Sequence, residues 1–241
     1  MRTASLVATV AFLAFLGVTF ADTGDKGGGG GGEGQTFPGE PCGGEPVESN
    51  PQTYGSAPKM TLEPDVDYQA VIETSCGELT VDLLEDEAPV NVNNFVFLAR
   101  EGFYTGLKFH RVELNSIVEA GDPNHRLDDP PDDPGYTVRD ELPERSREYV
   151  YGVMGMANEG VPDTGGSRFF FIVHDYDGAL EGSPEPAGYT PDFTILGRVP
   201  EDSWDTLQRI AKVPIHAGND PAQAVRPIDP VYIESIEILE R

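Results

Sequence analysis

The chain has 241 residues, with 16 basic and 42 acidic side chains and a formal net charge of −26. A chain this acidic repels phosphate groups, so we expect no nucleic-acid partner and no general attraction to anionic lipid. The length fits one good-sized domain, and the 28 glycines and 21 prolines predict that part of the chain is a linker. The acidity is typical of a solubilising surface, and a dedicated cationic partner is the alternative interpretation.

The N-terminal residues have the pattern of an export signal. Arg2 precedes an apolar stretch from Ala4 to Phe20, and small residues follow near Ala21. The stretch is almost long enough to span a bilayer, so residues 1–21 are predicted to be a cleaved signal peptide or an uncleaved anchor. Either interpretation predicts an extracytoplasmic protein, secreted or tethered to the outer face of the cytoplasmic membrane, with membrane contact only through such an anchor.

Residues 22–66 are predicted to be a disordered linker. They begin with an unbroken glycine run, Gly27 to Gly32, and continue with few large apolar residues. Such a segment buries too little surface to offset the entropy of ordering. Cys42 lies in this linker and Cys76 follows it, and a disulfide between them would tie the linker to the domain. Two free thiols are the alternative, because a flexible segment supplies no fixed geometry.

The folded domain is predicted over residues 67–241, with many short strands and two helices. The first helix begins at Pro89 and ends before Gly102, with Val92, Phe95 and Val96 on one face at helical spacing. The second is predicted over 202–211. Strands are predicted over 68–74, 79–83, 107–112, 117–120, 149–156, 168–173, 193–199 and 231–239. This order predicts a mainly β fold, a closed barrel with helices over its openings.

Most signatures of enzymes are absent. The sequence has no Gly-x-Ser-x-Gly elbow, no phosphate-binding glycine loop and no His-Glu-x-x-His helix. The four histidines have no metal-ligand spacing, and the acidic loop 128–133 lacks the alternating ligands and central glycine of a calcium loop. We therefore expect no metal and no cofactor, and interpret the acidic loop as a solvated one.

Three segments carry the functional signal. They are Phe109-His110-Arg111-Val112 followed by Gly121-Asp122-Pro123, then Gly152 to Asn158, then Gly166 to Ile172. In this order and spacing they resemble the cyclophilin family, and residues 88–95 and 193–199 resemble its first helix and a late strand. The resemblance covers roughly Tyr68 to Leu239. It implies an eight-stranded antiparallel barrel capped by two helices, peptidyl-prolyl cis-trans isomerase activity, and unfolded or folding Pro-containing polypeptides as partners of a monomer.

The resemblance also implies the site. Arg111 is the catalytic donor and Phe170 the floor of the proline pocket. The barrier to X-Pro rotation, about 20 kcal/mol, comes from amide resonance, and a fixed guanidinium can donate to the prolyl nitrogen or hold the adjoining carbonyl oxygen. The alternatives are a surface ion pair for Arg111 and core packing for Phe170. The implied substrate-binding residues are Ile117, Glu119, Ala157, Asn158, Arg168, Phe170, Tyr189 and Phe193.

Five positions depart from the family pattern, and two of them, Tyr189 and Phe193, stand where the family often has Trp or Leu and His. Ser116 stands where the family has an aromatic residue, unless Ile117 compensates, and Glu119 and Arg168 stand where the family has glutamines. We hypothesise that Glu119 and Arg168 form an ion pair that keeps Glu119 from neutralising Arg111. The leading function is an isomerase that acts on exported proteins during folding. The alternatives are a non-catalytic module that binds Pro-containing segments and a structural extracellular domain.

Overall fold

The computed structural model describes residues 42–124, 134–144, 149–174, 192–216 and 224–241, which belong to one compact unit. The predicted export signal, the first half of the predicted linker, the acidic loop and Tyr189 lie outside the described residues. The described strands are β1 (Tyr68–Thr74), β2 (Gly77–Leu83), β3 (Arg111–Val112), β4 (Ile117–Ala120), β5 (Val153–Met156), β6 (Phe169–Ile172), β7 (Ile195–Arg198) and β8 (Ile233–Glu240). The helices are α1 (Pro89–Arg100), the 3-10 turn η3 (Glu201–Ser203) and α2 (Trp204–Ala211). None of the helices in these ranges has the length and apolarity needed to cross a membrane.

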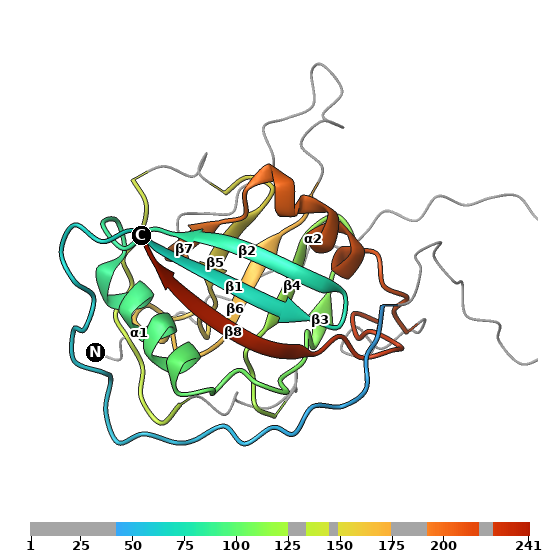
Figure 1. The fold of residues 1–241 in the computed structure, drawn as a ribbon, viewed down its shortest axis with the longest axis horizontal. Coiled ribbons are helices and arrows are strands. Elements are labelled where there is room, and N and C mark those ends of the chain that lie inside the picture. The colour runs from blue at the N-terminus through green and yellow to red at the C-terminus, as the bar shows by residue number, and fades with distance from the viewer. Residues whose placement is uncertain (1–41, 125–133, 145–148, 175–191, 217–223) are drawn as a thin grey trace, which may run out of the picture. The chain divides into compact units, whose positions relative to one another are not determined.

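All eight strands form one antiparallel sheet in the order β3-β4-β6-β5-β7-β2-β1-β8. The edge strands β3 and β8 meet through the residues that precede them. Lys108 bridges Tyr232, and the Phe109 N–H donates to the Val231 carbonyl at 3.0 Å. Lys108 and Phe109 thus pair with the residues before β8. Of the strand predicted over 107–112, only the last two residues belong to β3. The prediction of a closed antiparallel barrel with two helices is confirmed (Figure 1).

The barrel has two apolar faces because side chains alternate along each strand. In β6, Phe169 and Phe171 belong to the large interior core, whereas Phe170 belongs to a separate cluster on the outer face. The phenylalanine run therefore serves both faces, as the alternation predicts.

The two helices lie at different places on the barrel, α1 against β8 and α2 against β2 (Figure 1). α1 begins at Pro89, whose fixed φ suits the first turn of a helix. Its predicted apolar face is buried, including Val92, Phe95 and Val96. The second helix was predicted over 202–211. Its first two residues belong to the 3-10 turn η3, and the α-helix begins at Trp204.

Residues 42–66, which the sequence analysis assigned to the disordered linker, are ordered against the domain. Cys42 and Cys76 form a disulfide, with an S–S distance of 1.97 Å. The Tyr54 ring packs edge-on against Phe97 of α1, with centroids 5.0 Å apart. Further along, the Asn93 amide donates to the Lys59 carbonyl at 3.0 Å. The segment passes around α1 to the start of β1 in Figure 1. The disulfide at Cys42 and the hydrogen bond from the Asn93 amide to Lys59 fix the segment at two points. It is therefore ordered although it contains few apolar residues.

The double variant Cys42→Ser, Cys76→Ser should lower the free energy of unfolding by about 3–4 kcal/mol, because it frees a loop of 34 residues in the unfolded chain. Denaturant unfolding of the oxidised protein and the variant measures this difference. The reduced wild-type protein is the control and should match the variant. A difference below about 1 kcal/mol would show that the non-covalent contacts of residues 42–66 hold the segment without the bond.

Candidate active site

A row of four residues crosses the outer face of the barrel. Arg111 of β3 pairs with Glu119 of β4, Glu119 pairs with Phe170 of β6, and Phe170 pairs with Gly155 of β5. Directly paired residues of antiparallel strands have their side chains on the same face. The register therefore brings the expected donor and the expected pocket floor together, although they lie 59 positions apart in the sequence (170 − 111).

The outer face holds an apolar cluster around Phe170, which we call the apolar patch. Phe193 meets Phe170 edge-on, with ring centroids 5.3 Å apart. Phe193 is held by Tyr149, whose hydroxyl donates to the Phe193 carbonyl and accepts from its N–H at 3.3 Å. Ile117 belongs to the same cluster, so an aliphatic side chain is present next to the polar Ser116. The buried members of the patch are Ile117, Tyr149, Val153, Ala157, Phe170, Ile172 and Ile195.

Gly155 makes room for the Phe170 ring. A Cβ atom at position 155 would lie 2.5 Å from Phe170 Cζ, closer than non-bonded carbon atoms approach. The glycine is therefore required by close packing, and it sets the depth at which the ring lies.

Charged side chains form a second feature on this face, which we call the ion-pair network. Glu119 Oε2 accepts from Arg111 Nη1 at 3.1 Å, and Glu119 Oε1 accepts from Arg168 Nη1 at 3.1 Å. The outer guanidinium edges bind two further carboxylates: Arg111 Nε donates to Glu113 at 3.0 Å, and Arg168 Nη2 donates to Glu159. The hypothesised Glu119–Arg168 pair exists. The idea that it separates Glu119 from Arg111 is wrong, because one carboxylate is wide enough to bind both guanidinium groups.

Glu119 is the buried centre of this network, with its side chain 4% exposed. Burial by itself raises the pKa of its carboxyl, whereas His110, Arg168 and Arg111 lower it, and the net pKa is about 2. His110 Nε2 lies 3.6 Å from Glu119 Oε1, which is beyond hydrogen-bond length. We therefore attribute the lowered pKa of Glu119 mainly to the two guanidinium groups that bind it. Glu119 is therefore ionised at all physiological pH values.

Arg111 is half-buried and keeps part of its hydrogen-bonding capacity. A guanidinium carries five N–H donors. Glu113 accepts from Nε and Nη2, and Glu119 accepts from Nη1. Burial lowers the pKa of Arg111, but the two carboxylates more than offset it and raise the pKa above its usual value. Two N–H groups thus have no acceptor among the described residues, while a third of the side chain faces solvent.

The remaining expected residues lie at the edge of the patch. Ala157 is buried directly after β5, and its N–H donates to the Arg168 carbonyl at 3.0 Å. Asn158 is half-buried and its side-chain amide donates to the Asp192 carbonyl at 2.8 Å. All the expected site residues that the structure describes therefore gather on one face of the barrel.

Sequence reasoning missed four residues of this site: Glu113, Gly155, Glu159 and Tyr149. Glu113 could have been found, because it lies two residues after Arg111 and strand alternation places the two on one face. The other three are set by contacts between strands or loops that are distant in sequence, and no local pattern marks them.

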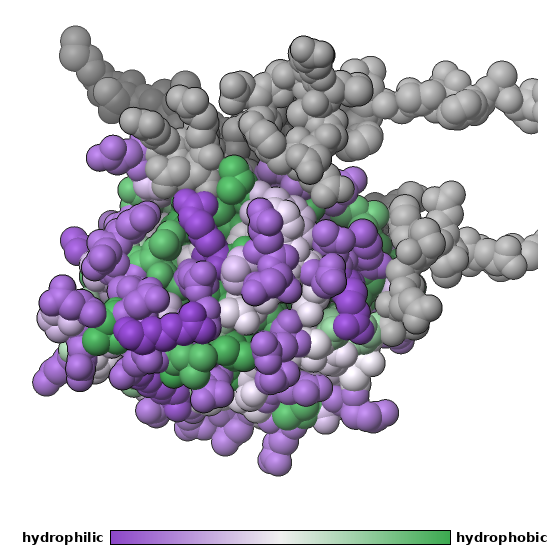
Figure 2. All heavy atoms as spheres, turned by 45° about the horizontal axis from the view of Figure 1, so that its top comes forward, coloured by the Kyte–Doolittle hydropathy of each residue, from purple (hydrophilic) through white to green (hydrophobic). Residues whose placement is uncertain are grey.

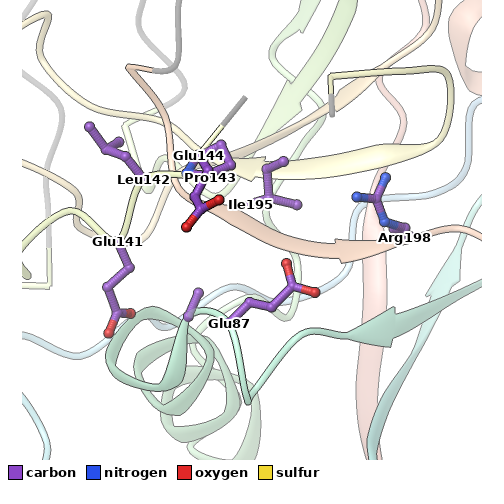
Figure 3. Close-up of a pocket in the computed structure, with 8 residues that line it drawn as sticks. Glu87, Glu141, Leu142, Pro143, Glu144, Ile195 and Arg198 are labelled. Atoms are coloured by element: carbon purple, nitrogen blue, oxygen red, sulfur yellow. The ribbon is translucent and has the colours of Figure 1, made fainter. Parts of the chain in front are cut away.

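A pocket of about 500 Å³ lies at the start of α1 (Figure 3). Glu141, on its wall, caps the helix by accepting from the Val90 N–H at 3.0 Å and the Asn91 N–H at 3.0 Å. Of the apolar patch, only Ile195 lines this pocket, and no member of the ion-pair network does. The Glu141 carboxylate at the N-terminus of α1 therefore has a structural role. Its lining residues are Glu87, Ala88, Glu141, Leu142, Pro143, Glu144, Ile195 and Arg198.

The chain belongs to the cyclophilin-type peptidyl-prolyl cis-trans isomerase family. A model of that family, described as cyclophilin type peptidyl-prolyl cis-trans isomerase/CLD, matches residues 69–238. The barrel is similar to the crystal structure of a cyclophilin-type isomerase of Cryptosporidium parvum, with a TM-score of 0.58, 26% identity, and coverage of 73% of this chain and 99% of that one. The same isomerase has been solved in the presence of the dipeptide Ala-Pro, and that structure matches with a TM-score of 0.57.

Relatives by sequence include the peptidyl-prolyl isomerase cwc-27 of Neurospora crassa, 32% identical over 74% of this chain and 35% of the relative. A spliceosome-associated protein CWC27 homologue of Xenopus laevis is 33% identical over 73% of this chain and 34% of the relative. A putative isomerase of Staphylococcus saprophyticus is 32% identical over 72% of this chain and 93% of the relative. The chain spans about a third of the length of the relatives that match first.

The expected extracytoplasmic location is contradicted by these comparisons. Several of the similar relatives are named as CWC27 proteins, and those of Xenopus laevis and Danio rerio are named spliceosome-associated. The expectation rested on an apolar run after one arginine, a pattern defined by composition alone.

Gly155→Ala should lower the free energy of unfolding by about 1–3 kcal/mol, because the new methyl group forces the Phe170 ring out of its position. Denaturant unfolding measures the loss. Gly55→Ala is the matched control, since no atom lies within 4 Å of the methyl group it adds. Equal stability of the two variants would mean that Phe170 is not tightly packed on position 155.

Glu119→Gln should destabilise the protein most near neutral pH. A carboxyl whose pKa is lowered by folding contributes stability above its unfolded pKa and loses it as the pH falls through the folded pKa. A shift from 4.5 to about 2 corresponds to a loss on the order of 3 kcal/mol, so the difference from wild type should shrink between about pH 4.5 and pH 2. Urea unfolding at a series of pH values measures it. Glu237→Gln at an exposed position on β8 is the control and should leave the free energy of unfolding near neutral pH close to that of wild type.

Proposed function

We propose that this chain accelerates the cis–trans isomerisation of X-Pro peptide bonds in polypeptides, with Arg111 as the catalytic residue and the apolar patch as the proline pocket. The observation that carries the proposal is the row across β3, β4 and β6. It puts a guanidinium, two of whose N–H donors have no acceptor among the described residues, on the same face as Phe170, with only β4 between their strands.

The chemistry needs only these groups. Rotation about an X-Pro bond breaks amide resonance, with a barrier of about 20 kcal/mol, and leaves a lone pair on the prolyl nitrogen. A guanidinium held in place can donate to that nitrogen or to the adjoining carbonyl oxygen as the charge develops, without reorganising. The apolar patch holds the ring and favours the less polar twisted amide. The backbone of Ala157 and Asn158 at the patch edge holds the substrate backbone, which fixes the bond relative to Arg111.

The relatives support proline-containing segments as the substrate class, since a structural neighbour has been solved with Ala-Pro. The names of the spliceosome-associated relatives favour partners in a splicing assembly over exported chains. Because the chain spans only a third of those relatives, the proposal concerns the isomerase domain and not the activities of the longer proteins.

A second candidate function is a binding module that holds Pro-containing segments without accelerating their isomerisation. The observation that favours it is the double engagement of Arg111: Glu113 and Glu119 offset its positive charge where the transition state needs it. The two candidates differ in one measurable property. Both bind proline peptides, but only the isomerase accelerates exchange between the cis and trans forms.

Arg111→Ala should reduce kcat/KM for a neutral Ala-Pro peptide by about 100-fold or more, which is the usual effect of removing a donor that stabilises a transition state. Protease-coupled assays of the full chain measure the rate. Arg100→Ala on α1 is the matched control, because Arg100 is also a partly exposed arginine bound to one carboxylate, Glu240. That variant should retain wild-type activity.

Two results would overturn the proposal. Folded wild-type protein that leaves several X-Pro peptides unaccelerated, yet binds them, would establish the binding module. Activity that survives in the Arg111→Ala variant would remove Arg111 from the catalytic role.

A further inference from the structure

Both ends of the ion-pair network are carboxylates. The network reads Glu113, Arg111, Glu119, Arg168, Glu159, so three negative groups hold two positive ones. The central carboxylate is buried, whereas the side chains of Glu113 and Glu159 are 33% and 42% exposed. The network therefore has a net charge of −1, and its excess negative charge faces solvent at its two ends.

The ends lie on opposite sides of Phe170. Glu113 follows β3, which is separated from β6 by β4, while Glu159 follows β5, on the other side of β6. A peptide whose proline occupies the patch at Phe170 therefore has one flank near each carboxylate. This places the two exposed carboxylates where residues before and after the proline would lie.

Each end also carries an exposed aliphatic side chain. Leu114 follows Glu113 directly and is 36% exposed, and Val161 lies two residues after Glu159 and is 56% exposed. Lysine and arginine combine an apolar stem with a charged tip, so they can cover an aliphatic side chain while their tip reaches a carboxylate. The carboxylates of Glu113 and Glu159 would repel an acidic side chain in the same place.

The surrounding surface adds to this field. Asp140 and Asp163 bind each other's backbone N–H groups next to the Glu159 end, at 2.8 Å and 2.9 Å. The chain as a whole carries a formal net charge of −26. Figure 2 shows that hydrophilic side chains cover much of one face of the molecule, around smaller hydrophobic patches. A cationic peptide is therefore drawn toward the site and an acidic one is repelled.

We propose that this site selects proline segments flanked by lysine or arginine, and that Glu113 and Glu159 are its specificity-determining residues. The inference rests on the proposed function, because it takes the apolar patch as the proline pocket. Glu113 binds a cationic residue of the peptide flank on the β3 side, and Glu159 binds one of the flank on the other side. Each contact is a partly exposed ion pair, so each raises kcat/KM for the cationic peptide by a few-fold, and salt weakens it.

The test uses one peptide framework around Ala-Pro, with Lys, Ala or Glu placed on either the N-terminal or the C-terminal flank. Exchange spectroscopy by NMR on the full chain measures kcat/KM without an auxiliary protease. For wild type we expect Lys over Glu by about 5–10-fold at low ionic strength on both flanks, falling toward about 2-fold at roughly 1 M salt.

Three variants locate the preference. Glu159→Gln should reduce the Lys-to-Glu ratio on one flank, and Glu113→Gln should reduce it on the other. Glu237→Gln on β8 removes an equal charge from an exposed position outside the network and should change neither ratio. A wild-type ratio near one, or a loss in Glu237→Gln equal to that of the network variants, overturns the inference.

The neutral Ala peptide separates the two proposals. If it binds but is not turned over, the isomerase proposal fails, and the Lys-to-Glu ratio of dissociation constants from fluorescence titration still decides the inference. If it is turned over but the ratios show no preference, only the inference fails.

Discussion

The pairing register of β3, β4 and β6 is the constraint on which both the core and the site depend. Side chains alternate across a strand, so a slip of one residue would turn every side chain to the opposite face. In β6 such a slip would place Phe170 in the barrel interior and would expose Phe169 and Phe171. It would also separate Arg111 from Phe170, because the present register pairs both of them with Glu119. The well-packed interior therefore enforces the geometry of the site.

Glu119 adds an electrostatic constraint to this register. A buried carboxylate is costly unless it is paired, and here two guanidinium groups from β3 and from the residue before β6 bind its two oxygens. A glutamine pair would satisfy the same positions without net charge. The exchange of both residues for an ion pair keeps the contact and changes the field: Arg111 becomes one member of a network with three carboxylates. The site thus has the family's framework and a different electrostatic environment.

The segment 42–66 and the disulfide affect the domain away from this face. Cys76 lies in the turn between β1 and β2, and the segment that it fixes runs along α1. The interior that the register depends on is therefore supported by residues outside the barrel.

The sequence by itself determined the elements, the fold class and most of the residues on the outer face. Alternation in the strands, Pro89 at the start of α1 and the spacing of the segments around Arg111 and Phe170 are local signals, so they can be read along the chain. Glu113 could have been read in the same way, from its spacing to Arg111. The tertiary structure alone decided that Glu119 binds both arginines, that Gly155 admits the Phe170 ring, and that residues 42–66 are ordered. Each of these depends on a distance between atoms that are remote in sequence, and burial and Coulomb energy depend on such distances rather than on composition.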